Sequence, residues 1–276
     1  MNYPKVTVSP EELAQGAYAA QSLERAINQF DEFGYLELEN AFEPGFIREL
    51  WQAYMAEYGQ LTEQELEPVS LKVGDRRFMI SVDIKAPFDN PALYANPFVL
   101  ELLEQLLGLG FLINSFTSVT AYPGAKTQQL HADHPPLFPV RGLSEHFTPY
   151  AVTVAIPLVD LDEQIGGTAV LPRSHKMDWS DFEALDAMKR ELAIARLGSC
   201  YLMDYRLFHQ GMANQSDRLR PVLYVVYSCP WFIDTANFSR QPAIKLRPAN
   251  VGNIPPKHLP LFKRVLQSTN SVLSML

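Results

Sequence analysis

The spacing of hydrophobic residues changes along the chain, from a helical period in the first third to a strand period in most of the rest. The helical part opens on Ser9, with Pro10 directly after it and Glu12 three residues later, an arrangement typical of a helix N-terminus. Apolar residues then recur every three or four positions until Gly34, and glycine commonly ends a helix. We therefore predict one helix from Pro10 to Gly34, and further helices over 44–58, 97–107, 181–195 and 257–267.

From residue 69 onward, most segments are rich in β-branched and aromatic residues, which favour strands. Two of these segments, 69–73 and 77–84, are joined by a Gly74-Asp75 turn and predict a hairpin. The other predicted strands are 35–39, 110–122, 127–132, 151–158, 169–172, 199–204 and 221–228. A helical first third followed by strands predicts the α+β class, with helices packed on a β-sandwich or barrel.

No internal repeat, low-complexity tract or Gly/Ser linker interrupts the 276 residues, so we expect a single domain over residues 1–276. The segment 135–149 is the one long stretch without regular periodicity, and it lies between two predicted strands. Long structureless loops inside compact domains usually carry function. We therefore expect a functional loop there, in which Arg141 and His146 are candidates for meeting a substrate, although loop residues are more often only solvated.

Composition and charge exclude several classes of protein. With 47% hydrophobic and 20% charged residues the chain is globular, and 23 basic against 31 acidic residues argue against a nucleic-acid partner. Two cysteines, Cys200 and Cys229, are too few for a disulfide framework or a Cys-rich zinc site. Neither a secretory signal nor an apolar run of membrane-spanning length is evident, so we expect a cytoplasmic protein without a membrane segment.

A histidine and a carboxylate two residues apart are the first candidates for chemistry. Residues i and i+2 of a strand project from the same face, so His131 and Asp133 are expected to point the same way. An imidazole beside a carboxylate suits a borderline divalent metal. Such a pair is more often an ordinary surface pair when it stands alone.

His209 changes that balance, because it lies between two predicted strands that can flank the first pair. Two histidines and one carboxylate form a face that leaves positions open on a non-haem Fe(II) ion, as oxygen-activating enzymes require. Arg220 follows eleven residues later, and a guanidinium in such a pocket can hold a carboxylate in bidentate fashion.

These residues, in this order, resemble the phytanoyl-CoA dioxygenase family of Fe(II)/2-oxoglutarate-dependent oxygenases. The segment 166–175, GGTAVLPRSH, is similar to the family's glycine-rich stretch ending in Pro-Gly-Ser-His, with Arg173 in place of the usual glycine. The segment 209–216, HQGMANQS, resembles the family's His-Gly-x-x-x-Asn-x-Ser pattern, with Gly211 displaced by one position. The resemblance extends over about residues 33–227.

The resemblance implies a double-stranded β-helix, a cupin-like jelly roll, with N-terminal and buttressing helices. It implies that His131, Asp133 and His209 are both the metal ligands and the catalytic centre, with Fe(II) as the metal and O2 as a co-substrate. It further implies that Arg220, Gln128 and Thr168 bind 2-oxoglutarate. Ascorbate is the reductant expected to support such an enzyme in vitro. Because halogenating relatives lack the carboxylate ligand, an intact Asp133 disfavours halogenation.

The remaining polar and aromatic residues have simpler interpretations. His134 points to the opposite face from Asp133 and is expected not to be a ligand, and His175 is expected to be structural. Arg76 and Arg77 follow a turn and are interpreted as surface charge. Asn214 and Ser216 are expected to shape the turn after His209; the aromatic residues near the last strand, expected to pack in the core, are Tyr224, Tyr227, Trp231 and Phe232.

The function that these observations favour is oxidation of a small, largely apolar metabolite, such as a terpenoid or alkaloid of secondary metabolism. Hydroxylation is the default outcome, and desaturation or rearrangement remain open. An acyl-CoA or amino-acid hydroxylase of the same family is the first alternative, and a non-catalytic metal-binding member is the second. A zinc hydrolase would leave Arg220 without a carboxylate to bind. A homodimer also stays open.

Overall fold

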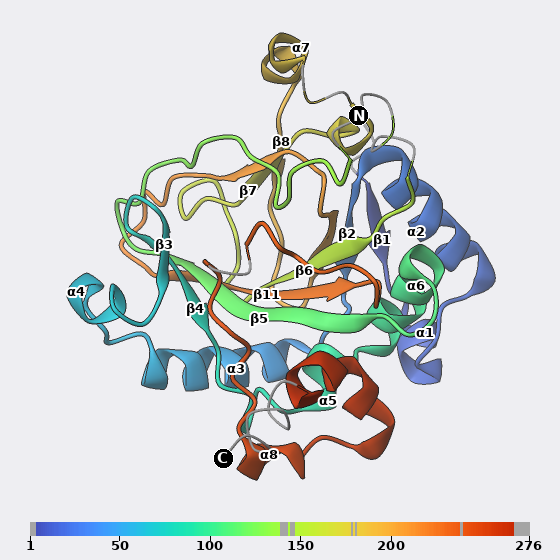
Figure 1. Cartoon of the computed structure of the whole chain (residues 1–276), viewed down its shortest axis with the longest axis horizontal. Helices are drawn as coiled ribbons and strands as arrows, with labels where there is room; N and C mark the ends of the chain where they lie inside the picture. The colour runs from blue at the N-terminus through green and yellow to red at the C-terminus, as the bar shows by residue number, and fades with distance from the viewer. Residues whose placement is uncertain are drawn as a thin grey trace.

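The frame of the molecule is a pair of β-sheets that face one another (Figure 1). The computed structural model describes residues 4–138, 143, 147–177, 179, 181–237 and 240–267. Within these residues the larger sheet has the order β1-β2-β9-β6-β11-β5-β4-β3, and the smaller has the order β10-β7-β8. The strands of the larger sheet are β1 (Lys5–Thr7), β2 (Tyr35–Glu39), β3 (Leu71–Gly74), β4 (Arg77–Ser81), β5 (Leu112–Ala121), β6 (Ala151–Pro157), β9 (Cys200–Asp204) and β11 (Arg220–Ser228); those of the smaller are β7 (Thr168–Val170), β8 (Glu191–Ala193) and β10 (His209–Gly211).

Helices cover the outer face of the larger sheet (Figure 1). The hydroxyl of Tyr54 hydrogen-bonds Ser118 and Thr120 of β5, which places α3 against that face. Because alternate residues of a strand point to opposite sides, Thr117 and Val119 face the smaller sheet instead. The helices are α1 (Pro10–Gln15), α2 (Ala20–Phe33), α3 (Pro44–Glu57), α4 (Glu63–Leu66), α5 (Pro91–Tyr94), α6 (Pro97–Leu107), α7 (Phe182–Ala187) and α8 (Pro248–Val251), with 3-10 turns η2 (Ser174–Lys176) and η3 (Pro256–Phe262).

This arrangement confirms the expected fold class, a jelly roll with N-terminal and buttressing helices. The hairpin of β3 and β4 and the helices α3 and α6 lie where the hydrophobic pattern predicts them. The buried hydrophobic residues form one large cluster between the larger sheet and the helices and a second between the sheets. Among the described residues, no helix combines the length and the apolar character that crossing a membrane requires.

Three local predictions are wrong. The expected helix from Pro10 to Gly34 is two helices, because Gly16 adopts a left-handed φ of 66° and closes α1. The expected helix 181–195 stops early, and its second half becomes β8, which pairs with β7. The expected strand 127–132 makes only an isolated bridge between His131 and His209. In the second case pairing with β7 overrides the local pattern, and in the third the segment lacks the strand pairing that its pattern would allow.

Candidate functional site

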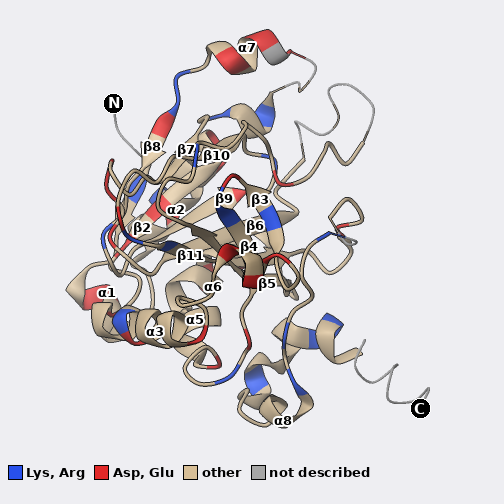
Figure 2. Cartoon of the chain, turned by 90° about the vertical axis from the view of Figure 1, so that its left-hand side faces the viewer, with Lys and Arg blue, Asp and Glu red and all other residues tan. Residues whose placement is uncertain are grey.

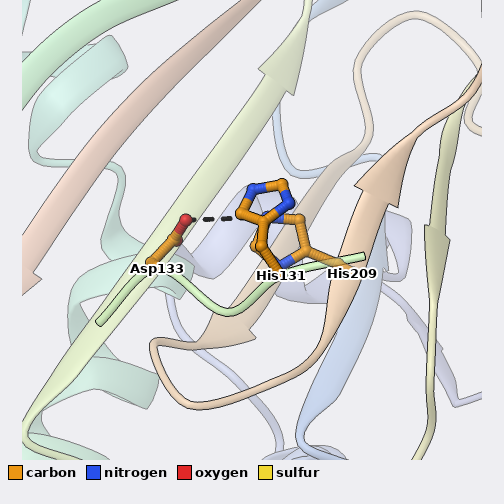
Figure 3. A group of neighbouring side chains, drawn as sticks. All are labelled: His131, Asp133 and His209. Carbon is orange, nitrogen blue, oxygen red and sulfur yellow. Dashed lines mark ion pairs between the residues drawn. The ribbon is translucent and has the colours of Figure 1, made fainter. Parts of the chain in front are cut away.

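Three side chains from separate parts of the chain converge at the edge of the smaller sheet (Figure 3). His131 and His209 exchange two backbone hydrogen bonds, of 3.0 and 2.7 Å, which set their imidazole rings side by side with centroids 4.5 Å apart. Asp133 points at the same place, with its Oδ1 3.6 Å from Nε2 of His209. One ligand atom from each residue lies within 4.8 Å of the other two. The structure therefore brings together the three residues that the sequence analysis names as metal ligands.

Backbone carbonyls fix the proton on each imidazole. The Nδ1 of His131 lies 2.9 Å from the carbonyl oxygen of Gln129, and the Nδ1 of His209 lies 3.0 Å from that of Leu207. A carbonyl oxygen only accepts, so each Nδ1 carries the hydrogen and each neutral ring keeps its lone pair on Nε2. Metal-binding histidines are commonly oriented in this way by a hydrogen bond at the other ring nitrogen.

Asp133 is held on both its side chain and its backbone. The hydroxyl of Thr153 on β6 donates to Oδ2 of Asp133 at 3.1 Å, which leaves Oδ1 facing the histidines. The amide Nδ2 of Asn237 donates to the backbone oxygen of Asp133 at 2.8 Å and to Oδ2 of Asp234 at 2.9 Å. Asp234 is buried and also accepts from the hydroxyl of Tyr205. The segment around residue 234 thus fastens the ligand loop to the body of the protein.

The donor set fits a borderline divalent metal. Metal–nitrogen and metal–oxygen bonds are about 2.0–2.2 Å, so ligand atoms around one ion lie about 3–4 Å apart, and the His209–Asp133 separation of 3.6 Å meets that requirement. Burial lowers the pKa of His131, and the neighbouring His209 lowers it further, so the neutral, metal-binding form is favoured. Two histidines and one carboxylate occupy one face and leave the others open, which is the donor arrangement of non-haem iron sites.

Two buried arginines lie behind the triad, where one was expected. Arg220 on β11 and Arg77 on β4 both pair with Ala121 of β5, from opposite sides. Both donate to the carbonyl of Met212, and the Nε of each has no hydrogen-bond partner among the described residues. Nor does a carboxylate of the described chain form an ion pair with either guanidinium. Buried charges require a counter-ion, so this end of the site calls for an anionic ligand.

The interpretation of Arg77 as surface charge is therefore wrong. Its side chain is 1% exposed, whereas its neighbour Arg76 is exposed and pairs with Glu63, as expected of a surface residue. The predicted strand 77–84 already put Arg77 on the same face as Met79 and Ser81. Which face of that strand points inward depends on the rest of the sheet, so the sequence pattern alone did not assign it.

Gln128 and Thr168 lie in the wall of the cavity that adjoins the triad. The amide of Gln128 donates to the carbonyl of Val73 at 2.6 Å, and its oxygen accepts from the backbone of Gly211 at 2.9 Å, so this side chain joins β3 to β10. Thr168 hydrogen-bonds the hydroxyl of Tyr224. Both residues therefore lie in the cavity wall beside the triad, and Gln128 links the two strand edges there.

Gly211 makes room for these contacts. A Cβ at position 211 would lie 2.2 Å from Nη1 of Arg77 and 2.5 Å from Oε1 of Gln128. Distances below 3.0 Å are not tolerated between such atoms, so only glycine fits without displacing one of the two side chains. The glycine that is displaced by one position from the family pattern thus has a direct steric function in this chain.

The other predicted roles are as follows. His134 is buried against Phe232 and is not one of the clustered ligands, as expected. His175 is buried away from the triad, and burial lowers its pKa to about 4, which agrees with a structural role. The amide of Asn214 bonds Ser216 and two backbone carbonyls, which confirms that it shapes the turn after His209. Arg141 and His146, the loop candidates, lie outside the described residues.

The aromatic residues expected in the core divide into three groups. Tyr227 and Phe232 are buried in the hydrophobic core. Tyr224 packs against the hydrophobic cluster between the sheets and also lines the cavity beside the triad. Trp231 is 63% exposed, so its expected core position is wrong.

The triad lies in the wall of a cavity between the two sheets. An inner part of about 90 Å³ adjoins the histidines and is lined by side chains of β4, β5, β6 and β11. It continues into an outer cleft of about 630 Å³ between β3 and the segment 127–133, with Arg240 and Gln241 at its rim. A ligand therefore reaches the triad from the side of the outer cleft.

Over the whole molecule, basic residues are dispersed over the elements, with acidic residues among them (Figure 2).

Comparisons with known proteins agree with this site. The family model described as "Phytanoyl-CoA dioxygenase (PhyH)" matches residues 30–222. Dioxygenase af480 of Aspergillus fumigatus is 30% identical over 151 residues, which are 53% of this chain and 47% of that protein. The chain thus spans about half the length of this curated relative.

Solved structures share the fold. AviO1 from Streptomyces viridochromogenes Tue57 superposes with a TM-score of 0.62 at 17% identity, covering 78% of this chain and 99% of that one. The epimerase SnoN, solved with Fe3+, alpha-ketoglutarate and nogalamycin RO, gives a TM-score of 0.60 at 17% identity over 76% and 85% of the two chains. HygX from Streptomyces hygroscopicus, solved with nickel and 2-oxoglutarate, gives 0.55 at 15% identity over 79% and 90%. At these identities the likeness concerns the fold alone.

Proposed function

The chain belongs to the phytanoyl-CoA dioxygenase family, and on this basis we propose that it is an oxygenase that requires Fe(II) and 2-oxoglutarate. The residues assigned to the metal are His131, Asp133 and His209, and those assigned to 2-oxoglutarate are Arg220, Gln128 and Thr168. To the second group we add Arg77. We also propose that the whole chain is one catalytic domain, since a single hydrophobic cluster includes residues from Val6 to Phe262.

The observation that carries this proposal is an open metal-ligand face next to two buried guanidinium groups that form no ion pair with a carboxylate of the described residues. Iron and 2-oxoglutarate, when bound, supply the activation of O2 for attack on a C–H bond. A carboxylate of the co-substrate would neutralise the charge that Arg77 and Arg220 leave unmatched. Nickel and 2-oxoglutarate in HygX, and Fe3+ and alpha-ketoglutarate in SnoN, support the same pair of ligands here.

The remaining side chains of the site orient and enclose the reactants. Thr153 and Asn237 hold Asp133 with its free oxygen toward the histidines. Gln128 joins the two sheet edges beside the triad. Exclusion of water protects a reactive oxidant and strengthens the electrostatic contacts inside the cavity.

The primary substrate is proposed to be a small, largely apolar metabolite, with a terpenoid or alkaloid of secondary metabolism as the favoured type. Apolar side chains of Val73, Met79, Val119 and Val226 line the inner cavity. An acyl-CoA would need a cluster of basic residues at the mouth, where the described lining has only Lys72, which is 3.7 Å from Glu67, and Arg240, with Asp75 on the same cleft. Hydroxylation, desaturation and rearrangement all begin at the same C–H bond.

Turnover of the co-substrate tests the activity directly. Purified protein loaded with Fe(II) and ascorbate is expected to convert 2-oxoglutarate to succinate, and to do so faster when a suitable substrate is added. The variant His131→Ala should lose both the bound metal and the succinate. If no substrate panel elicits succinate and the variant keeps its metal content, the chain is a non-catalytic member of the family or binds no metal at this site.

A further inference from the structure

Two hydroxyl groups on the floor of the inner cavity have no partner in the described part of the protein. Ser115 and Thr117 lie two residues apart on β5 and line the cavity together with the triad. Thr117 is 2% exposed, and its Oγ1 is fully buried with no hydrogen-bond partner among the described residues. Ser115 is 5% exposed, and its hydroxyl, which is not fully buried, makes no hydrogen bond to a described residue. Buried hydroxyls are normally satisfied, and their neighbours Ser118 and Thr120 on the opposite face both bond Tyr54.

The two hydroxyls lie farther along β5, away from the residue that pairs with the two arginines. Ala121, which stands between Arg77 and Arg220, is four residues from Thr117 and six from Ser115. At about 3.4 Å per residue these intervals are about 14 and 20 Å. Measured along the backbone of β5, Ser115 is therefore the farther of the two hydroxyls from a co-substrate anchored on the arginines.

The walls around this pair carry no charge that a charged substrate could use. Val226 lies opposite Ser115 in the sheet register, and Tyr224 lies opposite Thr117. Among the described residues that line the inner cavity, Asp133 is the one carboxylate, and neither lysine nor arginine is present. A carboxylate placed here would be desolvated without a lysine or arginine in the lining, which is strongly unfavourable, and the one carboxylate that could meet an ammonium group, Asp133, is assigned to the metal. Neutral oxygen atoms are the groups that such a surface accepts.

We propose that Ser115 and Thr117 form a specificity subsite that hydrogen-bonds a hydroxyl or carbonyl oxygen of an uncharged, otherwise apolar primary substrate. The proposal rests on the proposed function, because it assigns the molecule that occupies the open side of the triad. The unmet hydroxyls then have a purpose: the substrate oxygen supplies the partner that the folded protein lacks. A hydrocarbon of the same shape would leave both hydroxyls unpaired, so it would bind less well.

Matched ligand pairs test the subsite. Metal-loaded protein with 2-oxoglutarate under anaerobic conditions is titrated with rigid bicyclic to tetracyclic ketones and alcohols, each paired with its deoxygenated hydrocarbon. We expect the wild-type protein to prefer the oxygenated member of at least one pair by roughly tenfold, the effect of one neutral hydrogen bond. Ser115→Ala and Thr117→Val should lose this preference. Thr117→Val should keep or raise the melting temperature, since it removes an unpaired buried hydroxyl.

Thr120→Val is the control on the same strand, because its hydroxyl faces α3 and bonds Tyr54. It should lower the melting temperature and keep the ligand preference. The subsite proposal is overturned if the wild-type protein shows no preference, if Thr117→Val retains it, or if Ser115→Ala weakens 2-oxoglutarate binding instead. Failure of the wild-type protein to bind 2-oxoglutarate at all would overturn the proposed function, which separates the two results.

Discussion

Arg77 and Arg220 flank Ala121 on neighbouring strands, and both guanidinium groups donate to the same carbonyl oxygen, that of Met212. Burial, together with the nearby charge of Arg220, lowers the pKa of Arg77 to about 10. Two buried like charges with no carboxylate among the described residues to offset them are costly, and a bound anion would reduce that cost. Most of the predictions below follow from this anion site and from the triad beside it.

Truncation of either arginine is expected to weaken the binding of the co-substrate while the metal stays bound. Arg220→Ala and Arg77→Ala each remove a charge-assisted hydrogen bond of about 1.5–3 kcal/mol, which corresponds to roughly a 10- to 150-fold rise in the KM for 2-oxoglutarate. Arg76→Ala is the matched control, because its side chain is exposed and pairs with Glu63. Unchanged kinetics in Arg77→Ala would assign that residue a structural role.

A single methyl group at position 211 should disturb the same anion site. Gly211→Ala places a Cβ 2.2 Å from Arg77 Nη1, so the guanidinium must move and the affinity for 2-oxoglutarate should fall at least tenfold. Gly252→Ala is the control, since a Cβ there meets no atom within 4 Å. Isothermal titration with 2-oxoglutarate separates the two variants. Equal affinities would show that the arginine accommodates the methyl group without loss.

Removal of a ligand side chain should abolish stoichiometric metal binding. Asp133→Ala and His209→Ala each leave two donors, which bind a divalent ion far more weakly than three. Elemental analysis after dialysis is expected to give less than a tenth of the wild-type metal content. His258→Ala changes a histidine that is partly exposed and far from the triad in the sequence, and it should keep the full content. A variant of Asp133 that retains its metal would remove that residue from the assignment.

The amide of Asn237 is expected to position Asp133 rather than to touch the reactants. Asn237→Ala frees the backbone oxygen of Asp133 and removes the link to Asp234, so metal affinity should fall several-fold with the fold intact. The measurement is a competition titration of the metal, together with the circular dichroism spectrum. Asn253→Ala, which removes an exposed hydrogen bond to Asp89, should change neither.

Acid should destabilise the fold in part through His175, which is far from the metal ligands in the sequence. Burial lowers its folded-state pKa to about 4 from 6.5, so the neutral ring contributes stability that is full above pH 6.5 and is lost as the pH falls toward 4. The shift corresponds to up to about 3 kcal/mol. The free energy of unfolding of the metal-free protein, measured with urea, should therefore fall less between pH 7 and pH 5 in His175→Asn than in the wild-type protein. Parallel losses in the two proteins would contradict this assignment.

Much of the site is visible in the sequence because its chemistry depends on local order. His131 and Asp133 are two residues apart, which puts both on one side of an extended segment. The eleven residues from His209 to Arg220 lead from β10 in the smaller sheet to β11, the next strand of the chain, in the larger sheet. Helices such as 44–58 and 97–107 are likewise predicted because their apolar stripes repeat within a few turns. These features need no knowledge of distant contacts.

Tertiary structure alone decided the remaining features. Three of these features depend on which strands become neighbours. They are the inward-facing side chain of Arg77, the strand formed by 191–193, and the unpaired hydroxyls of Ser115 and Thr117. A strand pattern divides residues between two faces, but it does not say which face meets the cavity. The physical reason is that strand pairing joins residues far apart in the chain, so it is the assembled sheets that select the buried face.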